Sequence, residues 1–277
     1  MNVIRIATFR KNVTLLRIYR LLLIILVSVF SLVTGIGIVV FIIAGKSALT
    51  KVRACCTMWW ARSMCRILGI HIEKSGETEE QKGSFTVCNH ISYLDIFVVG
   101  SVRPSSFVAK QDVRSWPLAG WLASLAGTVF INRQSRRAAI EAMRMMEQKI
   151  DSGVNVVIFP EGTTSDGLVI KPFKSTLFNL PACRNITVIP VSIRYTGIDG
   201  KGMPQDRLGE IAWYGDMQLV PHLWHVLGLK SIEATLHFNP SISPVSESLP
   251  LPAARKRLCS LSHESIESGF ALADRSN

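Results

Sequence analysis

A long apolar run near the N-terminus limits how this chain can fold. Residues 21–44 include no charged residue and are mostly Leu, Ile, Val and Phe. As a helix rising about 1.5 Å per residue, the run would reach roughly 36 Å, enough to cross a hydrocarbon core of about 30 Å. It is longer than the apolar region of a signal peptide, which has about 7–15 residues. A buried core helix rarely lacks every polar face over so many turns. The run therefore predicts a membrane-embedded helix.

The orientation of this helix is left open by the charges around it. Basic residues lie on both sides, including Arg17 and Arg20 before the run and Lys46 and Lys51 after it. Neither flank carries a nearby acidic residue, so the positive-inside rule does not choose between them. A hairpin that turns near residues 35–37 would keep both basic flanks on one face. A single span and a re-entrant hairpin both remain possible.

The charge of the whole chain points to an anionic partner. The formal net charge is +11. No basic-aromatic module or zinc-finger spacing supports nucleic acid as this partner, so none is expected. Beside an apolar anchor, the anionic surface of a lipid membrane is the simpler partner. The six cysteines form no C-x-x-C pair and have no histidines at metal-ligand spacing, which indicates buried thiols in a reducing compartment and no metal site.

The segment after the apolar run divides the chain. Residues 54–70 include Trp59 and Trp60 among basic side chains, and this pattern fits an interfacial amphipathic helix or a core helix equally well. A polar stretch over residues 73–83 then breaks the pattern. We expect an N-terminal membrane anchor over residues 1–72 and a globular domain over residues 84–277.

Within this domain, short apolar strands alternate with helices. We expect strands at 85–88, 106–109, 128–131, 154–159 and 187–194, and helices at 94–100, 117–125, 136–150 and within 250–277. Such an alternation predicts an α/β layered domain with a largely parallel central sheet flanked by helices, preceded by an N-terminal membrane-embedded helical segment.

A histidine and an aspartate lie where the first strand passes into a helix. His90 directly follows the strand, and Asp95 lies in the first turn of the helix, in the segment 89–95 (NHISYLD). A neutral imidazole can take a proton from a hydroxyl while a carboxylate on its other nitrogen fixes the tautomer. By itself, the spacing favours a simpler interpretation, a capping aspartate beside a loop histidine.

Two further strands end in residues suited to binding an anion. Residues 127–133 (GTVFINR) end a strand with Arg133, whose guanidinium suits a phosphate. Residues 159–165 (FPEGTTS) end another with Glu161, Gly162 and Thr163, in a turn that offers N–H groups and hydroxyls. Because ligands gather at the carboxyl ends of parallel strands, all three segments should converge on one crevice. A surface arginine and a turn acid are the simpler interpretations of Arg133 and Glu161.

Taken together, these segments resemble a known family. N-H-x-x-x-x-D, G-x-x-F-I-x-R, F-P-E-G-T-x-S and V-x-P-V (residues 188–191) occur here in the order of the glycerolipid acyltransferase superfamily, whose best-known members are the 1-acyl-sn-glycerol-3-phosphate acyltransferases. All four match at their defining positions. The resemblance covers roughly residues 84–195.

The resemblance implies a role for each matching residue. His90 would be the general base that deprotonates the acceptor hydroxyl, and Asp95 would orient it. Arg133 would bind the phosphate of the acceptor, while Glu161, Gly162 and Thr163 would shape the acceptor site. Pro190 would pack in the fourth block or contact the acyl donor. No cofactor is implied, because the co-substrate would be an acyl-CoA or acyl carrier protein thioester.

Several functions remain to be separated. The resemblance favours acylation of 1-acyl-sn-glycerol-3-phosphate to phosphatidic acid. Another lysolipid, such as lyso-ornithine lipid, is the alternative acceptor, and a membrane scaffold without catalysis is a more remote one. A serine hydrolase is not expected, since the G-x-S-x-G elbow is absent. Membrane lipids, the lysophospholipid acceptor and the acyl donor are the expected partners, at the bacterial inner membrane with the active site on its cytoplasmic face.

Overall fold

The structure is a computed structural model that describes residues 2–41, 46–76, 83–132, 135–243 and 249–275. Its helices are α1 (Asn2–Phe41), α2 (Lys46–Leu68), α3 (Asp95–Gly100), α4 (Ala119–Leu125), α5 (Arg136–Asp151), α6 (Asn179–Arg184), α7 (Leu219–Val226) and α8 (Leu251–Arg275). Its strands are β1 (Ile70–Gly76), β2 (Phe85–Cys88), β3 (Ser105–Lys110), β4 (Val129–Ile131), β5 (Asn155–Ile158), β6 (Val188–Ile198), β7 (Lys201–Gly202) and β8 (Ile232–Phe238). Short 3₁₀ helices are η1 (Gln111–Ser115), η2 (Ser175–Phe178) and η3 (Gln205–Glu210).

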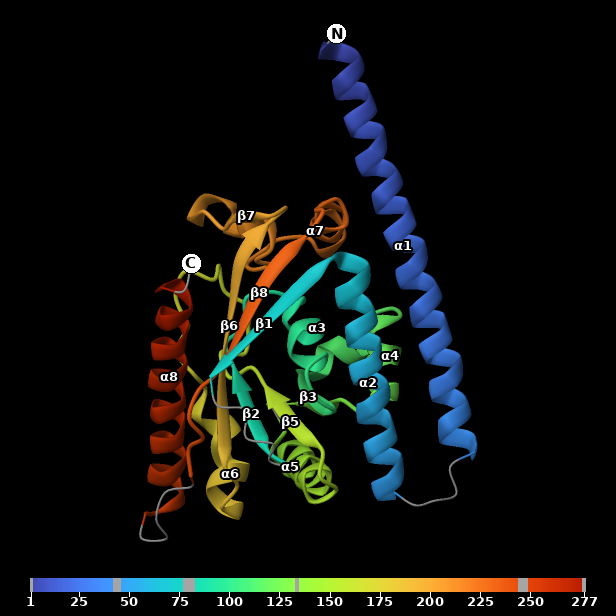
Figure 1. The fold of residues 1–277 in the computed structure, drawn as a ribbon. Helices are drawn as coiled ribbons and strands as arrows, with labels where there is room; N and C mark the ends of the chain where they lie inside the picture. The colour runs from blue at the N-terminus through green and yellow to red at the C-terminus, as the bar shows by residue number, and fades with distance from the viewer. Residues whose placement is uncertain (1, 42–45, 77–82, 133–134, 244–248, 276–277) are drawn as a thin grey trace.

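One sheet forms the centre of the molecule (Figure 1). Its strand order is β1-β8-β6-β2-β5-β3-β4, and β7 pairs with β6. Neighbouring strands are parallel except where β6 meets β8 and β7. Every residue of β2 and β5 is buried, as expected for strands covered by helices on both faces. The predicted α/β fold with a largely parallel sheet is confirmed.

The sheet separates two apolar cores. Val157 of β5 faces a core shared with α2, α3 and α7. Its neighbours Val156 and Ile158 face the opposite core, which is shared with α5, α6 and α8. This alternation follows from the two-residue period of a strand. Because both faces are covered, functional side chains can reach solvent chiefly at the ends of the strands.

The predicted membrane-embedded run lies in α1, a helix that begins well before it. Among the described residues, one segment, Asn12–Gly37, is long and apolar enough to cross a membrane. Its mean hydropathy is 2.2, and only 11% of its most apolar window is buried within the protein. Residues 42–44, the end of the predicted run, lie outside the described residues. Length and composition thus make α1 a candidate membrane span.

The helix α2 packs into the globular body along one face. Ala61, Met64 and Leu68 are buried, and α2 contacts α3. The Trp60 ring meets the Phe97 ring edge-on, with centroids 5.2 Å apart. This packing favours the core helix over the interfacial helix that the sequence left equally possible.

The globular body therefore begins earlier than the predicted boundary. Strand β1 follows α2 and pairs in parallel with β8. The polar stretch expected over residues 73–83 begins inside this strand. Its polar side chains are tolerated because β1 lies at the edge of the sheet. Both α2 and β1 thus belong with the domain predicted for residues 84–277.

An arginine fixes α1 to this body. Arg20 lies within the candidate span but is 6% exposed. Its guanidinium donates hydrogen bonds to the carbonyl oxygens of Leu227, Leu229 and Lys230, just after α7. One turn earlier on α1, the Arg17 guanidinium lies 5.5 Å from the centre of the Trp224 ring. Arg17 and Arg20 thus join α1 to α7 and the residues that follow it. The basic charges beside the apolar run did not predict this role.

We expect Arg20→Ala to destabilise the protein in mild detergent. The variant leaves three carbonyl oxygens without their charged donor, which should lower the free energy of unfolding by about 1–3 kcal/mol. Chemical denaturation followed by circular dichroism measures this change. Lys51→Ala, at an exposed position of α2, is the control and should unfold like the wild type. Equal stability of the Arg20 variant would contradict the assignment.

Candidate active site

The loop after β2 begins with an asparagine that extends the sheet. The Asn89 side chain donates a hydrogen bond to the Ile193 carbonyl oxygen at 2.9 Å and accepts one from the Ile193 N–H at 2.7 Å. Its amide thus pairs with β6 as a further peptide group would. This pairing fixes the direction in which the chain leaves the sheet just before His90.

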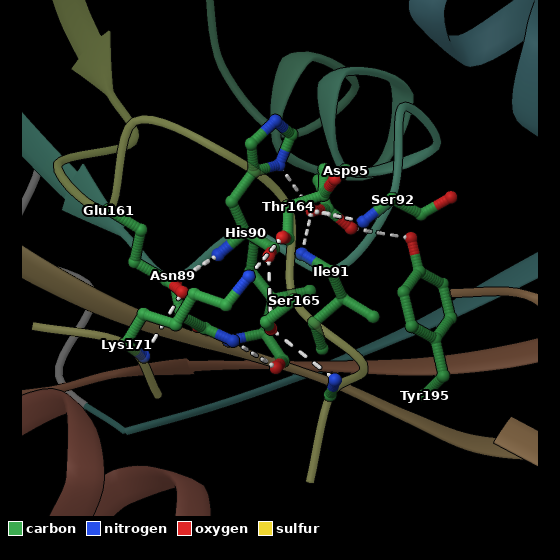
Figure 2. Close-up of polar contacts among 12 residues, drawn as sticks. Asn89, His90, Ile91, Ser92, Asp95, Glu161, Thr164, Ser165, Lys171 and Tyr195 are labelled. Carbon is green, nitrogen blue, oxygen red and sulfur yellow. Dashed lines mark hydrogen bonds and ion pairs between the residues drawn. The ribbon is translucent and has the colours of Figure 1, made fainter. Parts of the chain in front are cut away.

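The predicted pair of His90 and Asp95 is in contact (Figure 2). The His90 Nδ1 atom lies 2.8 Å from Asp95 Oδ2. The same oxygen accepts hydrogen bonds from the N–H groups of Ile91 at 2.7 Å and Ser92 at 3.0 Å. These bonds turn the loop back on itself, so the two side chains meet despite a five-residue separation. Asp95 is completely buried.

A tyrosine completes the hydrogen bonding of this carboxylate. The Tyr195 hydroxyl of β6 donates to Asp95 Oδ1 at 2.8 Å. Burial, together with the neighbouring Asp95, raises the pKa of Tyr195 well above its ordinary value, so the hydroxyl stays protonated. The sequence motifs did not identify Tyr195, because it lies one hundred positions from Asp95. The one sequence signal that points to Tyr195 is its place on β6, the strand that also contains the fourth sequence block, residues 188–191.

The His90 ring is oriented by stacking as well as by Asp95. It lies against the Phe159 ring with centroids 4.1 Å apart and an interplanar angle of 17°. The side chain is 18% exposed, and Nε2 makes no hydrogen bond to the described residues. With its Nδ1 proton donated to Asp95, a neutral imidazole would present the lone pair of Nε2 to a ligand. Such a nitrogen can accept a proton from a hydroxyl.

The backbone of His90 is held on both sides by the segment after β5. Glu161 Oε1 accepts a hydrogen bond from the His90 N–H at 2.7 Å. The His90 carbonyl oxygen accepts one from the Ser165 N–H at 2.9 Å and another from the Ser165 hydroxyl at 3.2 Å. Gly162 has φ 72°, a left-handed conformation that glycine adopts readily, in the turn between these two residues. The segments after β2 and β5 therefore converge as predicted.

Glu161 faces backbone groups. It is 3% exposed, and its Oε2 atom accepts a hydrogen bond from the Lys171 N–H at 3.1 Å. Burial raises the pKa of this carboxyl to about 7, although the two N–H donors oppose the shift. Thr163 is exposed beside it and Gly162 is half-buried. Their predicted contact with an acceptor stays a prediction.

Two further residues singled out by the sequence are Arg133 and Pro190. Arg133 lies outside the described residues. The strand before it, β4, is parallel to β3 and ends at the same edge of the sheet as β2 and β5. Pro190 lies within β6, where its carbonyl oxygen accepts a hydrogen bond from the Asn239 N–H at 3.0 Å. Within the described ranges, no group of three or more His, Cys, Asp or Glu side chains could hold a metal ion.

Comparison with known proteins gives matches over this same region. A family model described as Acyltransferase matches residues 69–194. The chain is 37% identical to a lyso-ornithine lipid O-acyltransferase of Rhizobium meliloti, over 66% of this chain and 65% of the relative. It is 38% identical to a 1-acyl-sn-glycerol-3-phosphate acyltransferase of Neisseria gonorrhoeae, over 58% and 60%. The chain thus spans somewhat less than two thirds of these two relatives.

Broader matches include a relative in sequence and a solved structure. A lyso-ornithine lipid O-acyltransferase of Rhodobacter capsulatus is 34% identical, over 76% of each chain. The crystal structure of the 1-acyl-sn-glycerophosphate acyltransferase from Thermotoga maritima superposes with a TM-score of 0.61, over 94% of this chain and 97% of the other. The two share 20% sequence identity, so this match speaks for the fold alone.

We expect Glu161→Gln to remove one pH dependence of stability. The folded pKa of about 7 lies above that of an unfolded glutamate, about 4.3, so between these values the native state keeps a proton that the unfolded state has lost. This contribution is complete below about pH 4 and is lost as the pH rises through 7. The free energy of unfolding of the wild type, relative to the variant, should therefore fall by about 1–3 kcal/mol from pH 4 to pH 8.

Denaturant titrations at a series of pH values measure this difference. Glu73→Gln, which changes an exposed carboxyl on β1, is measured in parallel as the control. A flat profile for Glu161→Gln would contradict the raised pKa.

Proposed function

We propose that this chain, which belongs to the acyltransferase family, transfers a fatty acyl group from an acyl thioester to the free hydroxyl of a lysophospholipid. The first candidate acceptor is 1-acyl-sn-glycerol-3-phosphate, with phosphatidic acid as the product. The donor would be acyl-CoA or acyl carrier protein. The observation that carries the proposal is the His90–Asp95 contact of 2.8 Å, which leaves Nε2 for a substrate.

The reaction would be direct. Nε2 of His90 accepts the proton of the acceptor hydroxyl while the oxygen attacks the thioester carbonyl carbon. The buried Asp95 carboxylate stabilises the imidazolium that forms. The tetrahedral intermediate then expels the thiolate as the C–S bond breaks, and the proton passes from His90 to the sulfur. The products are an ester and a free thiol, and no acyl-enzyme forms.

Hydrogen bonds around the pair support this chemistry by holding both partners still. Tyr195 and the N–H groups of Ile91 and Ser92 fix the Asp95 carboxylate. Glu161 and Ser165 fix the His90 backbone. A base held in place before the substrate arrives needs little rearrangement during the reaction.

Acylation of lyso-ornithine lipid is the second candidate. Relatives of both names are similar to this chain, at 37% and 38% identity. Neither acceptor is therefore favoured by similarity alone. The intact His90–Asp95 contact argues against the third possibility, a membrane scaffold without catalysis.

We place the reaction at the bacterial inner membrane, with the site facing the cytoplasm. The candidate span in α1 supports attachment to a membrane. All six cysteines lie in the described ranges as free thiols, which is typical of a reducing compartment. Three of them, Cys55, Cys56 and Cys183, are exposed, so the prediction that all six are buried was wrong. Acyl thioesters are also made on that side of the membrane.

Removing the base should abolish turnover. We expect His90→Ala to lower kcat by about 10²–10⁴-fold, the usual worth of a general base. Asp95→Asn should lose most of the turnover too, and Tyr195→Phe less, since Asp95 keeps its other donors. The assay follows thiol release and ester formation with purified protein. Wild-type turnover in the His90 variant would disprove the general-base mechanism.

Arg133 should affect binding of the acceptor more than the chemistry. We expect Arg133→Ala to raise KM for 1-acyl-sn-glycerol-3-phosphate about tenfold or more, with a smaller change in kcat. Lyso-ornithine lipid, offered in parallel with each donor, identifies the better acceptor by kcat/KM. An unchanged KM for the phosphate-bearing acceptor would remove Arg133 from its proposed role.

A further inference from the structure

Among the large apolar side chains exposed outside α1, five lie on elements that flank α1. Trp116 and Leu118, on the segment that joins η1 to α4, are exposed, and Trp121 of α4 is 66% exposed. On α7, Val220 is 76% exposed and Trp224 is also exposed. We call these five residues the aromatic surface. None of them is needed to fill a core of the domain.

Both elements lie against α1. A Cβ atom built on Gly35 of α1 would lie 3.5 Å from the Leu125 side chain of α4. About halfway along α1, Arg17 lies over the Trp224 ring of α7, and Arg20 binds the carbonyl oxygens that follow α7. The aromatic surface therefore lies on elements that flank α1, which itself exposes apolar side chains such as Leu22, Leu26 and Val33.

A row of ring contacts connects the two parts of this surface. The Trp116 ring meets the Trp213 ring edge-on at 6.4 Å, and Trp213 meets Tyr93 at 6.0 Å. The Tyr93 hydroxyl lies 3.1 Å from Nδ1 of His222 on α7. The row lies close to the candidate active site, because the backbone N–H of Trp213 donates a hydrogen bond to the Ile91 carbonyl oxygen at 3.1 Å.

We propose that the aromatic surface contacts the boundary between headgroups and acyl chains of the bilayer, beside α1. Tryptophan favours this boundary, where its apolar ring and its N–H group are both accommodated. Lys110 and Arg114 are exposed on the same segment as Trp116, and anionic headgroups attract such charges. The inference rests on the membrane attachment of α1 and does not depend on the acyl-transfer chemistry.

The contact would bring the candidate site to its lipid. With α4 and α7 both at the boundary, the loop that carries His90 lies just behind the lipid-facing side chains. A lysolipid could then present its hydroxyl at the site while its acyl chain stays in the bilayer. Such a route avoids the free-energy cost of moving an acyl chain through water.

Tryptophan quenching in vesicles tests the proposal with the full chain. The protein is reconstituted in phosphatidylethanolamine–phosphatidylglycerol vesicles with or without dibrominated phosphatidylcholine. The emission of wild type minus Trp121→Phe isolates the signal of Trp121. We expect brominated lipid to quench at least about half of this signal, and acrylamide in the water much less, as for a ring at the interface.

Two other tryptophans provide matched controls. Trp59 contacts Phe30 of α1, with ring centroids 5.8 Å apart, so its signal should be quenched by brominated lipid. Trp60 packs against Phe97, so its signal should respond weakly to either quencher. Trp224→Phe repeats the measurement from α7 should the Trp121 variant fold poorly.

Three outcomes would overturn the proposal. Quenching of Trp121 by acrylamide alone would place the surface in water. Protection from both quenchers would mean that protein, such as a second copy of the chain, covers it. Failure of brominated lipid to quench Trp59 would mean that α1 itself is outside the bilayer, which would leave the acyl-transfer chemistry untouched.

Discussion

The buried charge of Asp95 is the constraint on which the site depends. A carboxylate taken completely out of water is costly unless hydrogen bonds and an opposite charge replace its hydration. Here His90, two N–H groups of its own loop and the Tyr195 hydroxyl surround it. Because Tyr195 belongs to β6 and His90 follows β2, satisfying this one group joins two strands and α3 into a single rigid unit. The pair thus gains its geometry from the sheet, which the short sequence motif alone does not specify.

Much of the fold could be predicted from local sequence. Strands such as β2 and β5 are buried on both faces and consequently appear as uninterrupted apolar runs. By contrast, β1 was not predicted, because an edge strand needs only one apolar face and its exposed residues, such as Glu73 and Lys74, resemble a linker. The membership of the family could be predicted from four sequence blocks and is confirmed by the family model and by the relatives.

The contacts that could not be predicted are those between residues far apart in the chain. Glu161 binds the backbone of a residue seventy-one positions earlier, and an N–H group leaves no signature in the sequence. The Tyr195 hydroxyl likewise binds a carboxylate one hundred positions earlier in the chain. Arg20 precedes the apolar run in the sequence, a position typical of a basic residue that flanks a membrane segment. Its actual partners are carbonyl oxygens more than two hundred residues away. Local patterns thus identify which groups carry chemistry, whereas distant contacts decide how they are held.

The attachment of Arg20 to the end of α7 means that α1 is more than a tether. An unrelated apolar helix of equal length would supply the same affinity for a membrane, but it would lack a guanidinium facing the carbonyl oxygens of Leu227, Leu229 and Lys230. Those groups would then have to find water or other donors, and α7 would lose its support. The candidate membrane helix and the domain are therefore not interchangeable modules. A chimaera with a foreign apolar helix would lack the contacts that orient α1 against the end of α7.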